Sequence, residues 1–210
     1  MVRDLEPYVM SSPSRRAPAE VSELSLVRIR GTALMPVRPF IDRYFGPRGA
    51  EQFRSFLSIK EVSADFALEE VLPGAWYPFR VALDVVDGLV AMAGNPRVLR
   101  DFATYNLDYA TNVIFKAIFK IGTPEFMVAR ADQVWRKFYS RGRMTCVATS
   151  GHATVQLHDF AWLRPNYDRL VQHSIEAVLV KAGARSCTIK HSRCVLRGDP
   201  FCHSDYDWKA

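Results

Sequence analysis

The stretch CTIKHSRCVLRGDPFCHSDYDW, residues 187–208, holds three of the four cysteines of this 210-residue chain and two of its five histidines. Arg197-Gly198-Asp199-Pro200 is a turn signal between two β-rich arms, which predicts a hairpin. If Cys194 lies opposite Cys202, both sulfur atoms point to one face and are close enough to share a ligand or to pack together. Strict alternation would place His191 on the other face, unless a β-bulge or the end of the strand brings it round. The stretch therefore leaves three possibilities: a metal site, a disulfide or packed thiols.

The rest of the chain predicts helices followed by a second hairpin. Residues 143–158 alternate about a turn at Ser150-Gly151, as expected of two antiparallel strands. Residues 166–182 between the two hairpins have one apolar helical face, with Gly183 as the stop. The fold class predicted is α+β, with N-terminal helices packed on an antiparallel sheet made of C-terminal hairpins, and a helix between the hairpins.

The N-terminal half contains a short strand and several helices. Residues 24–31 alternate as a strand does, and helices are expected before Gly46, after Pro47, between Pro78 and Gly94, and from Thr123 onwards. A short element is expected at 64–71. Residues 113–119 are apolar almost all round and are expected to form part of a central helix.

Composition limits the organisation and the surroundings of the protein. Residues 1–22 are rich in Ser, Pro, Arg and Glu without apolar periodicity and predict a disordered tail, which leaves 23–210 as a single domain. There is no apolar run long enough for a membrane span and no signal-peptide core, so a cytoplasmic protein with reduced or metal-bound cysteines is expected. The net charge of +6 is spread along the chain and no DNA-binding motif is visible, so neither nucleic acid nor a membrane span is expected.

The closing pattern H-x-x-C-x-x-x-G-D-x-x-C resembles the signature of the 4-vinyl reductase domain. That family belongs to a superfamily of ligand-binding folds shared with haem-based nitric oxide sensors and small TRAPP transport-complex subunits. The segments 76–79, 119–144 and 181–208 also look like a bacterial family of uncharacterised function that shares this ending. The resemblance covers residues from about 25 to 208 and implies a ligand-binding fold.

The resemblance also implies a zinc site. In phenol-sensing members of the family, an acid and the two cysteines help to hold zinc, together with a further upstream cysteine. Cys194 and Cys202 match the two sulfurs, and His191 stands where the acid stands, a tolerable change because imidazole is a good zinc ligand. The upstream cysteine has no counterpart, and Asp168 is the residue expected to complete the set. Cys187 and His203 are alternative fourth ligands, and packed thiols or a disulfide remain the alternatives to zinc.

A hydrophobic ligand pocket between helices and sheet is the second implied site. The aromatic residues expected to line it are Trp76, Tyr77, Phe79, Tyr105, Tyr109, Phe115, Phe119, Trp135 and Trp162. Their rings supply apolar walls, and the tyrosines and tryptophans carry hydrogen-bonding tips. The alternative for each of them is ordinary core.

No haem is expected from the sequence. The sensor relatives use a proximal histidine on a helix and a Tyr-x-Ser-x-Arg triad, whereas here Tyr139, Ser140 and Arg141 are adjacent. His173 lies on the helix between the hairpins and is expected to be exposed.

Catalytic motifs are also missing from the sequence. It has no G-x-S-x-G elbow, phosphate-binding glycine loop or H-E-x-x-H, and no catalytic residue is assigned. The function predicted is a non-catalytic sensory module that binds a small hydrophobic or aromatic ligand and signals through a protein partner or homodimer. The alternatives are a dimerising scaffold without a ligand and, third, an enzyme acting on a hydrophobic substrate.

Overall fold

The computed structural model describes residues 26–59, 70–111 and 122–209. Its elements, in chain order, are β1 Arg28–Arg30, η1 Gly31–Ala33, α2 Val37–Phe45, α3 Gly49–Ile59, β2 Trp76–Pro78, α4 Phe79–Ala93, α5 Val98–Thr111, α7 Pro124–Val128, α8 Ala131–Phe138, β3 Arg143–Thr149, β4 His152–His158, α9 Pro165–Lys181, β5 Ser186–Arg193, η2 Val195–Arg197 and β6 Cys202–Lys209.

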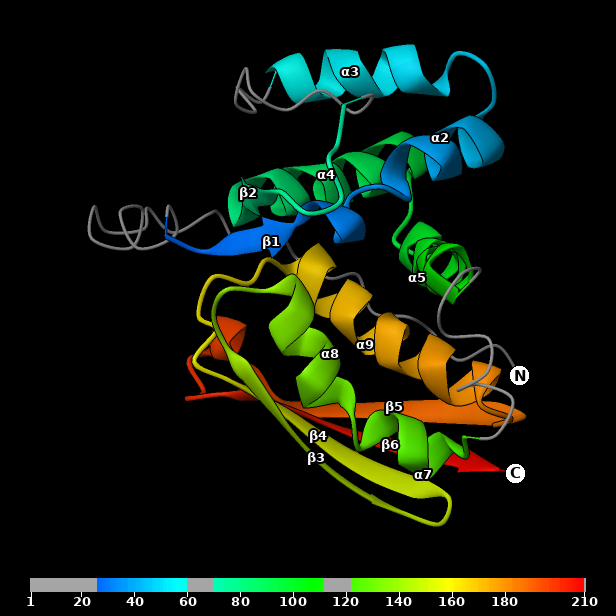
Figure 1. Ribbon diagram of the computed structural model, residues 1–210, viewed down its shortest axis with the longest axis vertical. Coiled ribbons are helices and arrows are strands. Elements are labelled where there is room, and N and C mark those ends of the chain that lie inside the picture. Colours follow the sequence, from blue (N-terminus) through cyan, green and yellow to red (C-terminus); the bar gives the residue numbers. More distant parts are fainter. Residues whose placement is uncertain (1–25, 60–69, 112–121, 210) are drawn as a thin grey trace, which may run out of the picture.

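The main sheet has four antiparallel strands in the order β3-β4-β6-β5. Its two hairpins are the two that the sequence predicts. Along β4 the buried residues Ala153, Val155 and Leu157 alternate with polar ones, which is the pattern of a sheet covered on one face. α7, α8 and α9 cover the buried face (Figure 1).

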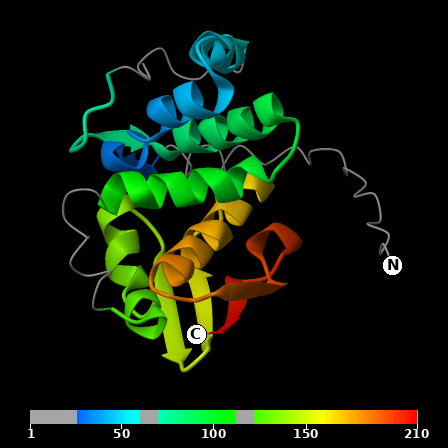
Figure 2. The ribbon, with the colours of Figure 1, turned by 90° about the vertical axis from the view of Figure 1, so that its right-hand side faces the viewer.

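The N-terminal helices form a layer above the sheet helices, and α9 lies between this layer and the sheet (Figures 1 and 2). Arg164, just before α9, joins the two parts: its Nη1 lies 2.6 Å from Asp84 Oδ1 and 2.9 Å from Asp87 Oδ2 of α4. Asp84 is buried, so the paired arginine offsets the cost of burying its charge. The first turn of α9 is thereby tied to α4.

Helix boundaries follow the local sequence. Pro78 precedes α4, and Gly94 ends it with a left-handed φ of +67° that residues with a Cβ rarely adopt. Thr123 caps α7 by accepting a hydrogen bond from the Phe126 N–H at 3.3 Å, with Pro124 at the first helical position.

The α+β class and the helix between two hairpins are confirmed. The strand β2 was not predicted: Trp76–Pro78 pairs antiparallel with β1. The expected tail at 1–22, most of the element at 64–71 and the apolar helix at 113–119 lie outside the described residues. None of the helices in the described ranges is both long and apolar enough to cross a bilayer.

Candidate metal centre

Four side chains predicted as metal ligands meet between the start of α9 and the β5–β6 hairpin. Asp168 comes from the first turn of α9, His191 from β5, Cys194 from the residue before η2, and Cys202 from the first position of β6. One donor atom from each lies within 4.8 Å of the other three. The tertiary fold therefore brings together residues separated by up to 34 positions.

The spacing of the donor atoms matches a small tetrahedral site. Cys194 Sγ lies 3.8 Å from Cys202 Sγ and 3.8 Å from Asp168 Oδ2, and His191 Nε2 lies 3.3 Å from the same oxygen. Zinc bonds of roughly 2.0 to 2.3 Å at the tetrahedral angle separate neighbouring ligands by roughly 3.3 to 3.8 Å. The set of two sulfurs, one nitrogen and one carboxylate oxygen therefore fits Zn²⁺ in chemistry, and these three separations fit its bond geometry.

A β-bulge brings His191 into the cluster. The β5–β6 register shifts between His191 and Arg193, which is the irregularity required if His191 and the cysteines are to share a face. His191 Nδ1 lies 2.7 Å from Ser204 Oγ, and this contact fixes the ring so that Nε2 points inward. Nε2 is buried and makes no hydrogen bond, although Asp168 Oδ2 lies 3.3 Å away. A buried polar atom without a hydrogen bond needs an explanation, and a metal ion bound at Nε2 would supply one.

The hairpin turn holds both sulfurs in place through backbone groups. The Cys194 N–H donates to Asp199 Oδ2 at 2.7 Å, and the Val195 N–H donates to Cys202 Sγ at 3.5 Å. Gly198 makes the turn possible with a φ of +88°. The Arg-Gly-Asp-Pro sequence therefore sets the separation of the sulfurs as well as reversing the chain.

The protonation of the cluster reflects crowded donors. Burial raises the pKa of Asp168 to about 6. The hydrogen bond from the Cys202 thiol lowers the pKa of Cys194, and the same contact raises the pKa of Cys202. The neighbouring Cys194 sulfur raises the pKa of His191. The shifts of His191 and the two cysteines arise because neighbouring groups share few protons, and a cation would take the place of those protons.

The alternative ligands lie elsewhere. Cys187 is half-buried, and its thiol is 3.8 Å from the Thr188 carbonyl. His203 points away from the cluster to the other side of the sheet, where its Nε2 lies 3.2 Å from Asp205 Oδ1. All four cysteines of the chain are free thiols in this structure. Asp168 is thus the fourth donor that the geometry supplies.

The nine aromatic residues predicted for a ligand pocket occupy several places. Phe79 is fully buried in edge-to-face contact with Phe160 and Tyr167, and Trp135 stacks on Tyr139 at 3.8 Å. These rings fill the space between the helical layer and the sheet.

The other predicted pocket residues lie around this centre or outside it. Trp162 meets the edge of Phe160, and Tyr77 accepts a hydrogen bond from the Leu72 N–H. Tyr105 packs near Phe40, while Trp76 and Tyr109 are exposed. Phe115 and Phe119 lie outside the described residues.

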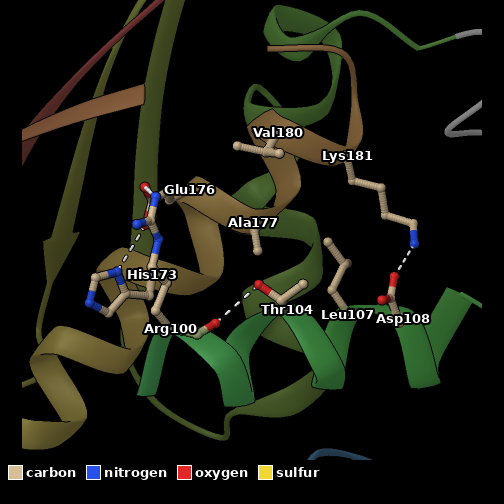
Figure 3. Close-up of a pocket in the computed structure, with 9 residues that line it drawn as sticks. All are labelled: Arg100, Thr104, Leu107, Asp108, His173, Glu176, Ala177, Val180 and Lys181. Atoms are coloured by element: carbon tan, nitrogen blue, oxygen red, sulfur yellow. Dashed lines mark hydrogen bonds and ion pairs between the residues drawn. The ribbon is translucent and has the colours of Figure 1, made fainter. Parts of the chain in front are cut away.

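A cleft of about 290 Å³ lies between α5 and α9, and sequence reasoning did not find it (Figure 3). None of the seven predicted aromatic residues that the structure describes lines it. His173, which was expected to be exposed, is half-buried at this cleft, with Nδ1 3.0 Å from Glu176 Oε2. The i,i+3 spacing of His173 and Glu176 was the available signal.

Sequence comparison gives no family: no protein-family model matches the chain, and no curated protein matches it significantly. Comparison with solved structures does give a fold. An H-NOX protein from S. oneidensis, solved in the Fe(II)NO ligation state, superposes with a TM-score of 0.66 at 10% identity, covering 87% of this chain and 100% of its own. An unliganded Fe(II) H-NOX protein from K. algicida has the same score at 11% identity, covering 87% and 97%. The chain therefore has an H-NOX-like fold, as the resemblance to a superfamily that includes nitric oxide sensors implied.

The expectation of no haem has to be corrected. A structure with the same fold, with a TM-score of 0.57, 11% identity and coverage of 87% of this chain and 100% of its own, is described as "Modulating Heme Redox Potential Through Protein-Induced Porphyrin Distortion". The expectation relied on the missing Tyr-x-Ser-x-Arg spacing and on the expected exposure of His173, which is half-buried. The absence of one set of contacts does not by itself exclude a haem site, which has to be tested at the site itself.

Proposed function

We propose that this chain is a non-catalytic sensory module of the cytoplasm whose C-terminal hairpin is fastened to α9 by Zn²⁺. His191, Cys194, Cys202 and Asp168 would hold the ion, which supplies a structural cross-link. The observation that carries this proposal is the set of four donors within 4.8 Å of one another, with the buried His191 Nε2 making no hydrogen bond. Structural zinc sites typically use four protein ligands of this kind.

The position of the cluster suggests how a signal would pass through the molecule. Asp168 lies in the turn of α9 that follows Arg164, which binds Asp84 and Asp87 of α4. One end of α9 is therefore joined both to the helical layer and to the β5–β6 hairpin. A small hydrophobic or aromatic ligand that favours one position of α9 would alter the hairpin and the surface beside it. A protein partner or a second copy of the chain would then bind the altered surface.

Metal analysis tests the zinc cross-link directly. Protein purified without added chelator should contain close to one zinc per chain, and Cys194→Ser should remove it. Cys187→Ser is the matched control, because its half-buried thiol lies on the same hairpin but outside the cluster. Absence of zinc from the wild type, or equal zinc in both variants, would end the zinc proposal.

Ligand titration tests the sensory role. Haem belongs in this test, because a structural neighbour is described by its haem chemistry. Adding haemin should be followed by absorption spectroscopy, and adding small aromatic compounds by calorimetry, each with sedimentation to detect a change of oligomeric state. A sensor should bind at least one compound with a defined stoichiometry and change its assembly. Failure of every compound would contradict the sensory role and leave the zinc result standing.

The dimerising scaffold is the second candidate, and the aromatic centre favours it. Phe79, Phe160, Tyr167, Tyr139 and Trp135 pack ring against ring, with centroid separations of 3.8 to 6.1 Å. A scaffold needs a filled interior of this kind. It predicts a stable dimer in sedimentation that no ligand perturbs.

A further inference from the structure

The cleft between α5 and α9 combines a charged end with apolar walls. Its lining includes Arg100, Thr104 and Leu107 from α5, and His173, Glu176 and Ala177 from α9 (Figure 3). Its volume of about 290 Å³ is at the lower end of the range for small-molecule sites. A molecule the size of one aromatic ring with a short side chain therefore suits the space.

The charged end is organised by a buried acid. The Glu176 side chain is only 7% exposed, and both of its oxygens are bound: Oε1 by Arg100 Nη2 at 2.6 Å and Oε2 by His173 Nδ1 at 3.0 Å. Burial raises the pKa of Glu176, but the hydrogen bond from His173 and the charge of Arg100 outweigh burial, so the pKa lies below its ordinary value. The acid is thus charged and already satisfied, and has no need of a cationic ligand.

Arg100 retains donors for a ligand. A guanidinium has five N–H groups in a fixed fork, and the contact with Glu176 occupies one nitrogen of the three. The Arg100 side chain is 62% exposed at the cleft, while Glu176 restrains its direction. An arginine that is oriented by a buried acid and still has free donors is suited to binding a carboxylate.

The remaining walls are apolar. Leu107, Ala177 and Val180 line the space beyond the charged end, and Val180 is one of the exposed large hydrophobic residues. An ion pair between Lys181 and Asp108 bounds the opposite end (Figure 3). A ligand with an apolar body would cover Val180 and remove it from water.

We propose that the α5–α9 cleft binds a small monocarboxylate with an apolar or aromatic body, whose carboxylate pairs with Arg100 while the body lies against Leu107, Ala177 and Val180. This inference rests on the proposed ligand-binding function and gives it a place and a chemical class. The cleft shares α9 with the zinc cluster, so the ligand would contact the helix that the proposed cross-link fastens.

Calorimetric titration with three matched probes tests the chemical class. The probes are 3-phenylpropionate, 3-phenylpropanol and 3-phenylpropylamine, which differ only in the end group. The carboxylate should bind with a 1:1 stoichiometry and at least about tenfold more tightly than the alcohol or the amine, because a charge-assisted hydrogen bond contributes about that factor. Equal affinity for the three probes, or no binding at millimolar concentration, overturns the proposal.

Variants of the cleft residues test the location of the binding site. Arg100→Gln should weaken 3-phenylpropionate about tenfold or more, while Arg97→Gln, which removes a charge near the start of the same helix and outside the cleft, should leave affinity within about twofold. Ala177→Leu fills the cleft without changing any charge and should abolish binding. If Ala177→Leu binds the carboxylate as the wild type does, the site is elsewhere and the proposal fails.

Thermal unfolding and zinc content, measured for each variant, show that it is folded. A chain that binds haemin or another compound but not the carboxylate keeps the sensory function and loses this inference. A chain that binds nothing loses both.

Discussion

The proposed metal site and the α5–α9 cleft each contain one buried acid of α9. Their surroundings shift the pKa values of these two acids in opposite directions. Asp168 lies among two thiols and an imidazole, and burial raises its pKa to about 6. Glu176 has an arginine and a histidine on its two oxygens, and its pKa is lowered. The site around Asp168 has more acceptors than cations and suits the proposed metal ion. The charge of Glu176 is neutralised within the protein, and Arg100 keeps donors for an anion.

Removal of the proposed zinc ion should have the largest effect on stability, because it breaks the cross-link between the hairpin and α9. If zinc is present at about a thousand times its dissociation constant, it stabilises the folded chain by about 4 kcal/mol. Chelation should then lower the melting temperature by about 8 to 16 °C, given about 2 to 4 °C for each kcal/mol in a chain of this size. Calorimetric melting with and without EDTA measures the shift, and an unchanged melting temperature would show that no metal cross-link exists.

Asp168→Asn tests whether the acid of the cluster is a ligand. The amide keeps the shape and the contact with Gln172 but loses the charge, so zinc affinity should fall by more than about 100-fold, or about 2.7 kcal/mol. Competition with a chromophoric chelator measures the affinity. Asp207→Asn, an exposed aspartate of the same sheet, should leave it unchanged. Equal affinities for the two variants would mean that three ligands suffice.

Ser204→Ala tests the support of His191. Loss of the 2.7 Å contact with Nδ1 frees the ring, and loss of such an outer partner weakens metal binding by about 10- to 100-fold. The same competition assay applies, with the exposed Ser192→Ala as the control. An effect as large as that of Asp168→Asn would point instead to a direct role for the serine.

Glu176→Gln should have the smallest effect on stability and should leave zinc untouched. Removing the carboxylate costs about 1 kcal/mol at neutral pH, because its partner Arg100 is largely in water and screened. Since the folded-state pKa lies below the ordinary 4.5, this stabilisation is present above that pH and disappears as the pH falls through the folded-state value. Urea unfolding at pH 7 and pH 4 should show the gap to wild type shrinking in acid. Glu51→Gln on α3 is the exposed control, and a gap that widens in acid would contradict the assigned ion pairs.

The sequence predicted the C-terminal half well because its signals are local. Period-two alternation, the Ser150-Gly151 turn and the Arg-Gly-Asp-Pro turn define the two hairpins, and these match β3 to β6. Alternation alone could not place His191 with Cys194 and Cys202, so a bulge or the end of the strand was required, and the structure has the bulge. The three-residue strand β2 was missed, because pairing with β1, some 48 residues away, and not its own composition, makes it a strand.

The aromatic residues show where sequence reasoning stops. Phe79 and Trp76 are three positions apart and of the same class, yet one is fully buried against Phe160 and the other is exposed under Arg30. Nothing in the local pattern separates a ring that lines a pocket from one that fills a core. The cleft was invisible for the same reason, because its walls come from two helices about 70 residues apart in the chain.

By itself, the sequence determined the fold class, the two hairpins with a helix between them, and the residue types at 191, 194 and 202. Only the tertiary structure decided that Asp168, rather than Cys187 or His203, stands within 4.8 Å of those donors, and that Arg100 reaches Glu176. The physical reason is the distance along the chain over which each effect acts. Hydrogen-bonded turns and alternation act over a few residues, whereas the meeting of side chains from different elements depends on how helices and sheet pack as solid bodies.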